Sequence, residues 1–326
     1  MSTRPDVRMP GMLVAGVTAL VSGVSVFVNG YGVRSFSSPA VYTTGKNLVA
    51  ALFLAVAAWA GLSARRKKAA PWCAHFVSRE HSERPGRGVG TWLALAYVGV
   101  VGGGLAFVLF FDGLAVSTPA SAAFWRDTMV VWVAALAVPI LRERVEWWNI
   151  AAIALLIGGE IIVAGGIGHL AFSRGEVDVL SSTAMWAVEV VVARRLLRTM
   201  SPASLALVRM GVGTVALCVY LAATGAMANL LSVNVHQVGW LAATGLLLSA
   251  YVATWMTALA RARALDVTSV LVVSAAITWL LQLIAGTVTP VTSTLGLSLI
   301  ATGAGLVIWY GVKRKRPAPY RAPAAG

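Results

Sequence analysis

The sequence is poor in charged and in reactive side chains. Only 12% of its 326 residues are charged, with 12 acidic residues, two cysteines and four histidines in all. Cys73 and Cys218 show no metal-site spacing and are too few for a disulfide framework. The histidines fall in predicted loops, which argues against a buried histidine relay: His75, His81, His169 and His236.

Motifs of nucleotide hydrolysis and of the common hydrolases are also missing. The sequence has no Gly-rich phosphate loop ending in lysine, no HExxH pair, no cluster of His and Cys, and no GxSxG turn. ATP hydrolysis, zinc chemistry and serine hydrolysis therefore have no residues to carry them. We expect a protein that is not an enzyme and that uses no cofactor and no metal.

Apolar residues are abundant instead. They make up 58% of the chain, and the mean hydropathy is +0.80. A water-soluble domain needs a more polar exterior, so the solvent around most of this chain must be lipid. Lipid satisfies no backbone polar group, which leaves helices or a closed barrel. The apolar runs last about 20 residues without alternation, which excludes the barrel and predicts an all-α, polytopic membrane protein.

The apolar runs predict ten transmembrane helices. Hydroxyl residues followed by proline mark the starts of three of them, at Ser38-Pro39, Thr118-Pro119 and Ser201-Pro202. Asp266 is placed to cap the ninth helix in the same way. The predicted spans are 11–29, 40–62, 91–115, 119–140, 147–166, 178–198, 202–222, 238–260, 267–288 and 293–312.

The net charge of +14 follows the predicted topology. With the N-terminus in the cytoplasm, most of the 26 basic residues fall in cytoplasmic segments, and the outer loops hold only Arg34 and Arg174. This distribution predicts a multi-pass membrane protein whose tails, 1–10 and 313–326, are both cytoplasmic. The lipid bilayer is then the expected partner of the basic surface, and no nucleic-acid partner is expected.

Two stretches of the sequence resemble each other across the two halves. "SSPAVYTTGKNLVAALFLAVAAWAG" (37–61) resembles "MSPASLALVRMGVGTVALCVYLAATG" (200–225), and each places a cation, Lys46 or Arg209, after Ser-Pro-Ala. "NIAAIALLIGGEIIVAGG" (149–166) is similar to "TLGLSLIATGAGLVIWYG" (294–311). The chain therefore divides into two five-helix repeats, 11–166 and 178–312, and the odd helix number makes the second one inverted. Inverted repeats are typical of secondary transporters, whose substrates bind between the repeats near the midplane.

These helix starts, and the junction "VPILRERVEWWNIAAIALLIGGEIIVAGG" (138–166) with Glu143, resemble the drug/metabolite transporter superfamily in its form with two EamA repeats. The resemblance covers nearly the whole chain and implies transport without naming a substrate. The tryptophan-rich and tyrosine-bearing spans further resemble the aromatic amino-acid exporters of bacterial inner membranes, and the resemblance implies that location. The second repeat departs from the pattern, because "AGTVTPVTSTLG" (285–296) has no acid where the first has Glu143.

Six charged residues lie inside predicted spans. Each would cost roughly 2.5–3.5 kcal/mol at a helix centre in lipid, so they must pair or line a wet cavity. Neighbours on a helix point about 100° apart, and we therefore expect Arg126 and Asp127 to have different partners. The six are Lys46, Arg126, Asp127, Glu160, Glu189 and Arg209.

The repeats sort these charges into two groups. Lys46 and Arg209 occupy matching positions, which favours a role in the scaffold, although Lys46 is kept as a site candidate. Arg126 has no polar counterpart and is the candidate for binding a substrate carboxylate, or else it pairs with Glu160 or Glu189. Asp127 and Glu189 are candidates for ammonium binding or proton exchange, or for structural pairs. Under the alignment of the Ser-Pro-Ala starts, Glu189 matches Val26.

Aromatic residues within the spans are candidates for the wall of a substrate cavity. Trp186 lies one turn before Glu189, and Tyr251 lies one turn before Trp255, so each pair shares a helix face. Plain packing is the alternative for every one of them. The remaining candidates of this kind are Tyr97, Trp279 and Gln282.

Together these features predict a secondary transporter that exports amino acids, aromatic or bulky apolar ones first, by alternating access. The alternatives are a multidrug, nucleotide-sugar or sugar-phosphate carrier, or a membrane sensor or scaffold without transport. Phosphate would favour clustered cations, whereas Lys46, Arg126 and Arg209 are spread over both halves. Proton coupling, the direction of flux and the oligomeric state, a monomer included, are left open.

Overall fold

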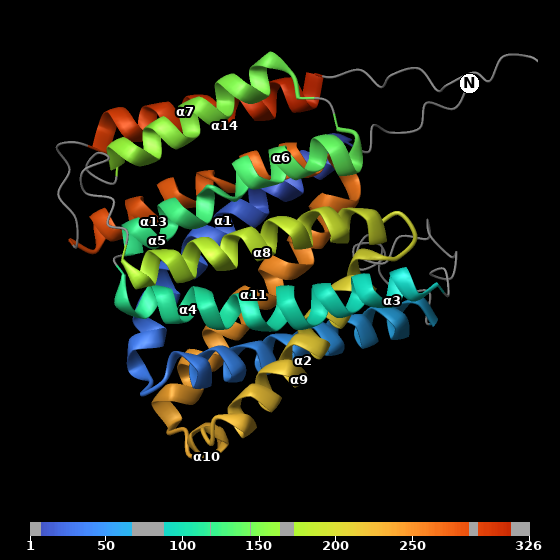
Figure 1. Ribbon diagram of the computed structural model, residues 1–326, viewed down its shortest axis with the longest axis vertical. Coiled ribbons are helices and arrows are strands. Elements are labelled where there is room, and N and C mark those ends of the chain that lie inside the picture. The colour runs from blue at the N-terminus through green and yellow to red at the C-terminus, as the bar shows by residue number, and fades with distance from the viewer. Residues whose placement is uncertain are drawn as a thin grey trace, which may run out of the picture.

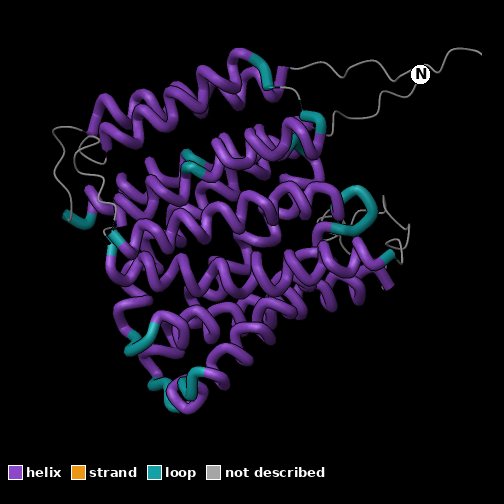
Figure 2. The backbone as a smooth tube through the Cα atoms, viewed as in Figure 1, coloured by secondary structure: helices purple, strands orange, loops and turns teal. Residues whose placement is uncertain are grey.

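The computed structural model describes residues 8–66, 88–117, 119–143, 145–163, 173–286 and 293–313, and all regular structure within these ranges is helical (Figures 1 and 2). Most of the helices lie side by side as a bundle, and α9 and α11 run obliquely to their neighbours (Figure 1). They are α1 (Arg8–Gly32), η1 (Val33–Ser35), α2 (Pro39–Arg66), α3 (Val89–Ala96), η3 (Tyr97–Leu105), α4 (Ala106–Val116), α5 (Pro119–Asp127), α6 (Met129–Leu141), α7 (Trp147–Val163), α8 (Arg174–Leu196), α9 (Pro202–Ala223), α10 (Met227–Leu231), α11 (Val235–Arg261), α12 (Ala264–Leu271), α13 (Val273–Ile284) and α14 (Ser293–Lys313).

The predicted fold class, an all-α polytopic membrane protein with two repeats, is confirmed. Seven helices within the described ranges are long and apolar enough to cross a membrane, and α7 contributes a shorter apolar helix, Trp147–Gly159. Each of the ten predicted spans corresponds to one helix or to consecutive helical segments. The short helix α10, which lies between the seventh and eighth spans, was not predicted.

Three of the spans are interrupted. The third consists of α3, η3 and α4, in which η3 is a π-helix. The fourth breaks between α5 and α6 at Thr128, whose hydroxyl donates to the Trp125 carbonyl at 2.6 Å and competes with the helical ladder. The ninth breaks at Val272, between α12 and α13. The fourth and ninth spans hold corresponding places in the two repeats, so both repeats carry a local helix irregularity at a similar point.

Helix caps explain where the observed boundaries differ from the predicted ones. Ser173 and Glu176 form a capping box that starts α8 earlier than predicted, and Asn234 and Gln237 do the same for α11. His236 is therefore in the first turn of α11, where it contacts Trp240, and its predicted place in a loop is wrong. The other three histidines and Cys73 lie outside the described residues, as does the end of the fifth predicted span.

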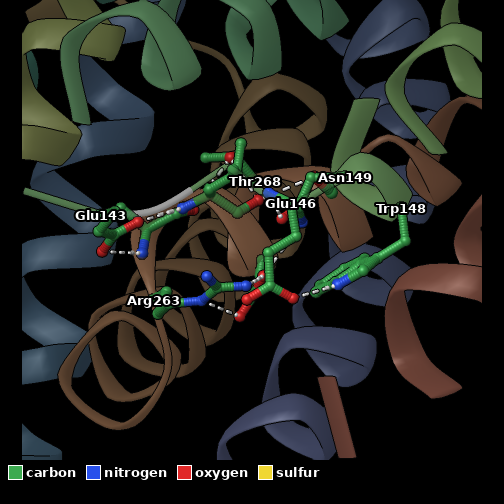
Figure 3. A network of polar contacts seen from close by, with 10 residues as sticks. Glu143, Glu146, Trp148, Asn149, Arg263 and Thr268 are labelled. Carbon is green, nitrogen blue, oxygen red and sulfur yellow. Dashed lines mark hydrogen bonds and ion pairs between the residues drawn. The ribbon is translucent and has the colours of Figure 1, made fainter. Parts of the chain in front are cut away.

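The cap of α12 comes from the other repeat. Both carboxylate oxygens of Glu143 accept backbone N–H bonds, from Ala264 at 3.0 Å and from Leu265 at 3.2 Å (Figure 3). The prediction that Asp266 caps this helix is wrong, because the Arg263 guanidinium holds its carboxylate at 2.6 and 2.7 Å. Glu143 therefore caps the N-terminus of α12, where unpaired N–H groups and the positive end of the helix dipole attract a carboxylate.

The last helices of the two predicted repeats pack on each other. α7 and α14 are far apart in the sequence but lie together at one edge of the bundle (Figure 1). Their approach depends on small residues: a Cβ at Gly159 would lie 2.5 Å from the Gly296 carbonyl oxygen, and one at Gly303 would lie 3.0 Å from that of Ala152. Small residues let helix backbones pack closely in membranes.

This packing predicts that Gly159→Val lowers the stability of the detergent-solubilised protein by about 1–3 kcal/mol, the usual cost of overpacking. The matched control is Gly158→Val, because a Cβ at Gly158 meets nothing within 4 Å. Thermal unfolding of the two variants compares them directly. Equal unfolding midpoints would show that the close contact between α7 and α14 does not stabilise the fold.

Candidate functional site

A cavity of about 710 Å³, counting the part that is open to solvent, lies between helices of both halves of the chain. Its wall is contributed by α1, α2, α4, α5, α6, α8, α9, α11 and α12. The lining residues are Ser22, Ser25, Val26, Asn29, Lys46, Phe107, Phe110, Phe111, Arg126, Met129, Trp186, Glu189, Val190, Arg209, Leu248, Tyr251, Trp255 and Leu271.

Both interrupted helices with corresponding places in the repeats reach this cavity. Arg126 and Met129 line it on either side of the break at Thr128, and Leu271 lines it beside the break at Val272. Thr128 and Val272 keep right-handed helical backbone angles, so each span continues through its irregular residue. The cavity therefore lies beside a local irregularity of one helix in each repeat.

The π-helix η3 supplies backbone acceptors behind the cavity wall. The Gly102 carbonyl accepts from Trp186 Nε1 at 3.0 Å and from Arg209 Nη2 at 3.1 Å, and the Gly103 carbonyl accepts from Asn47 Nδ2 at 2.9 Å. A Cβ at Gly102 would collide with the Glu189 carboxyl group, so glycine is required there. A π-helix thus joins side chains from α2, α8 and α9, and such segments are frequent at functional sites.

Arg209 and Glu189 form a buried, two-bond ion pair. Arg209 Nε donates to Glu189 Oε1 at 2.5 Å, and Nη2 donates to Oε2 at 3.0 Å. Each side chain is only 4% exposed. Parallel bonds of this kind are the strongest that a guanidinium makes with a carboxylate. Glu189 is consequently the partner of Arg209, and the alternative that it pairs with Arg126 is wrong.

Arg126 and Asp127 pair with each other, against the expectation of separate partners. Arg126 Nε and Nη2 donate to Asp127 Oδ1 at 2.9 and 2.6 Å. α5 ends at Asp127, so the long arginine side chain can fold back around the helix end. Further donors of Arg126 bond Ser22 Oγ at 3.1 Å and Ser274 Oγ at 2.5 Å, which fixes the guanidinium between α1 and α13.

Lys46 lies in an aromatic setting. It is 1% exposed, and its Nζ lies 3.7 Å from the Phe111 ring centroid and 5.5 Å from that of Phe107. Its hydrogen bond to Asn29 Oδ1 is long, at 3.5 Å, and the Tyr42 hydroxyl donates to the same oxygen. Aromatic faces attract the ammonium group but do not neutralise its charge.

Aromatic rings form two parts of the wall. Trp186 contacts Phe107 at 5.2 Å and Phe110 at 5.3 Å between ring centroids. Tyr251 and Trp255 are stacked, with centroids 6.0 Å apart and planes inclined by 13°. Edge-to-face and stacked rings are the stable arrangements of aromatic pairs. The cavity can thus hold a flat apolar group while charged groups lie at its wall.

The ten residues predicted for the site divide between the cavity and its surroundings. Asp127 lies behind Arg126, and the Tyr97 hydroxyl on η3 donates to the Met185 carbonyl at 3.1 Å. Trp279 and Gln282 are on α13, outside the lining set, and the Glu160 side chain lies outside the described residues. The six that line the cavity are Lys46, Arg126, Trp186, Glu189, Tyr251 and Trp255.

Two groups of lining residues were missed. The first is a polar stripe on α1, formed by Ser22, Ser25 and Asn29. Its spacing of three and four residues, inside an otherwise apolar span, is the signal that would have found it. The second group is Phe107, Phe110 and Phe111, whose phenylalanine side chains cannot be told from lipid-facing ones without the neighbouring helices.

Comparison of the sequence with known families also divides the chain into two repeats. The model of the EamA-like transporter family matches residues 9–165 and again residues 173–309. The chain belongs to the EamA-like transporter family. It is a multi-pass membrane protein of the drug/metabolite transporter type, as its helix starts and junction had indicated.

A solved structure titled "Crystal structure of protein" shares the fold of this EamA-like chain. The TM-score is 0.68 at 18% sequence identity, with 91% of this chain and 98% of that chain covered. No curated protein matches the sequence. The structural likeness at this identity concerns the fold alone.

The ion pair between Arg209 and Glu189 predicts a strong effect of removing one partner. Glu189→Ala leaves a buried guanidinium without its counter-charge, which costs about 3–5 kcal/mol of stability. Glu189→Met combined with Arg209→Met removes both charges and should recover much of that loss. Unfolding midpoints in detergent measure both variants. A single variant as stable as the double one would mean that the pair is not needed to balance charge.

Proposed function

We propose that this EamA-like protein is a secondary transporter of the bacterial inner membrane that exports amino acids, aromatic or bulky apolar ones first, with both termini in the cytoplasm. The observation that carries the proposal is the composition of the cavity between the repeats. It combines an aromatic wall for a large apolar side chain with polar and charged groups for the two ends of an amino acid.

The aromatic wall supports a bulky side chain as the main recognised feature. Trp186, with Phe107 and Phe110 against it, faces the same cavity as the stacked Tyr251 and Trp255. The indole or phenyl ring of a bound substrate would make contacts with these aromatic side chains. Such contacts contribute roughly 0.5–1.5 kcal/mol per aromatic pair beyond the burial of area.

Polar groups in the cavity supply acceptors for an ammonium group. Asn29, Ser22 and Ser25 line the cavity on α1. Glu189 contributes a carboxylate whose oxygens each accept one bond from Arg209 and retain further acceptor capacity. These groups favour an amino acid over a purely apolar drug.

The charges make a nucleotide sugar or sugar phosphate less suitable. A phosphate dianion is best held by several cations that have no other counter-charge. Arg209 is held by Glu189 and Arg126 by Asp127. Since both arginines are neutralised within the protein, the cavity suits a substrate with one carboxylate better than it suits a phosphate dianion. A membrane sensor without transport is separated from all carriers by measuring flux.

We expect proteoliposomes containing the wild-type protein to carry radiolabelled tryptophan and phenylalanine in a saturable manner, faster than leucine and threonine. Trp186→Ala should slow tryptophan flux about tenfold, because it removes one ring of the wall. Trp59→Ala is the matched control, since Trp59 is 70% exposed on the outside of α2. Measurements with and without a proton gradient test coupling. The absence of flux for every amino acid would reject the proposal.

Alternating access would require one end of the bundle to open. In the proposed orientation, the bonds from Glu143 to the start of α12 lie at the cytoplasmic end and join the two repeats (Figure 3). Arg195 adds a bond between the repeats, from its Nη2 to the carbonyl of Ile140 at 2.9 Å. These contacts support a closed cytoplasmic end that must break during transport.

This closed end predicts that Glu143→Ala favours the cytoplasm-open state. The loss of a helix cap is worth about 0.5–2 kcal/mol, which would raise the open population several-fold. A thiol reagent applied from the cytoplasmic side to Ser25→Cys, in a chain lacking Cys73 and Cys218, reports the opening. Glu143→Gln retains one acceptor and should change labelling less. Equal labelling in the wild-type, Glu143→Ala and Glu143→Gln backgrounds would show that Glu143 does not control the opening.

A further inference from the structure

Lys46 differs from the two arginines of the cavity in its counter-charge. Among the residues that the structure describes, no carboxylate lies within ion-pair distance of its Nζ, whereas Arg126 and Arg209 each have one. Its side chain is buried, and it lines the cavity. An ammonium group has three donors, and the acceptor that Lys46 reaches among the described residues, Asn29 Oδ1, is 3.5 Å away.

The second repeat indicates what is missing beside Lys46. Aligning the two Ser-Pro-Ala starts pairs Lys46 with Arg209, and it pairs Val26 with Glu189. In the second repeat the cation and the acid form the buried ion pair. In the first repeat the acid's place is taken by Val26, an apolar residue that lines the cavity one turn before Asn29. The position of the carboxylate that would balance Lys46 is therefore held by an apolar side chain at the cavity wall.

We infer that the substrate supplies this carboxylate and that Lys46 binds it, an assignment that rests on the proposed transport function. The substrate class is then a monocarboxylate with a flat apolar body. Its carboxylate lies between Lys46 and Val26, where Glu189 lies in the other repeat. A buried charge without a counter-ion is costly in a membrane, so an anion that neutralises Lys46 is bound favourably.

This assignment replaces Arg126 as the carboxylate-binding residue. The Arg126 guanidinium is occupied by Asp127, Ser22 and Ser274, which leaves it to hold the helix break. Arg209 is occupied by Glu189 and by the Gly102 carbonyl. The Phe107 ring centroid lies 5.2 Å from the Arg209 guanidinium carbon and 5.5 Å from Lys46 Nζ. The same ring therefore lies close to both cations.

Two substitutions test the assignment from opposite directions. Lys46→Met removes the charge and keeps the length of the side chain. Val26→Glu supplies an internal carboxylate at the position that matches Glu189. The probes are tryptophan, tryptamine, which has the same indole without a carboxylate, and indole-3-acetate, which has the carboxylate without an ammonium group. Binding to the purified protein and flux in proteoliposomes are measured for each probe.

The wild-type protein should prefer tryptophan and indole-3-acetate to tryptamine. Both variants should bind these two carboxylates at least tenfold more weakly and should lose the preference over tryptamine. Lys46→Arg should keep the preference, because it keeps the cation. Thermal unfolding identifies any variant that does not fold. Val26→Glu, which adds a counter-charge to Lys46, carries the test if Lys46→Met fails to fold.

The outcomes separate this inference from the proposed function. Tryptophan transport by the wild type, with an unchanged carboxylate preference in a folded Lys46→Met or Val26→Glu protein, would overturn the inference alone. Transport of indole-3-acetate that needs Lys46, without transport of any amino acid, would support the inference and reject amino-acid export. Failure of the wild type to bind or carry any of the probes would overturn both.

Discussion

The need to neutralise charge inside lipid governs the arrangement of this transporter's interior. A charged side chain is tolerated in a membrane span only when a counter-charge, a set of hydrogen bonds or water compensates it. The buried pair of Arg209 with Glu189 and the pair of Arg126 with Asp127 meet this requirement with protein groups. Each pair also touches a distortion of the helical backbone, because Arg209 bonds a carbonyl of the π-helix η3 and Arg126 lies at the break after α5. Charge compensation and helix interruption are therefore parts of one construction, and together they keep a polar cavity open between the repeats.

Much of the fold could be predicted because lipid imposes simple rules. Apolar run lengths predict the spans, and Ser-Pro-Ala starts reveal the repeat at Lys46 and Arg209. The interruptions could not be predicted in this way. Thr128 and Val272 lie inside apolar runs whose composition is compatible with a continuous helix. At Thr128 the irregularity accompanies the bond from its own hydroxyl to the Trp125 carbonyl. The cap of α12 illustrates the same limit, because Glu143 is separated from Ala264 by more than a hundred residues and only packing brings them together.

The sequence predicted which residues belong to the candidate site better than it predicted which of them pair with each other. Trp186 with Glu189, and Tyr251 with Trp255, were placed on shared faces by helical spacing, and both pairs line the cavity. Spacing along one helix cannot say which charge on another helix is the partner. The rule that adjacent side chains diverge describes the Cβ directions within a helix, and it failed for Arg126 and Asp127 because a long side chain at a helix end can turn back. The polar stripe of Ser22, Ser25 and Asn29 has a clear helical period, but it lies in a first helix that is otherwise apolar.

The differences between the two repeats carry more functional information than their likeness. A duplicated scaffold gives two helices of the same kind, each with a cation at the same place, and by itself it would produce a symmetric cavity. Glu189 neutralises one of these cations, and Val26 leaves the other without an acid. The cavity consequently has one cation with a counter-charge and one without an acidic partner among the described residues, both near the Phe107 ring. In the assignment proposed above, this difference between the repeats orients a substrate that has one carboxylate and an apolar body, while the ion pair in the second repeat stabilises the architecture.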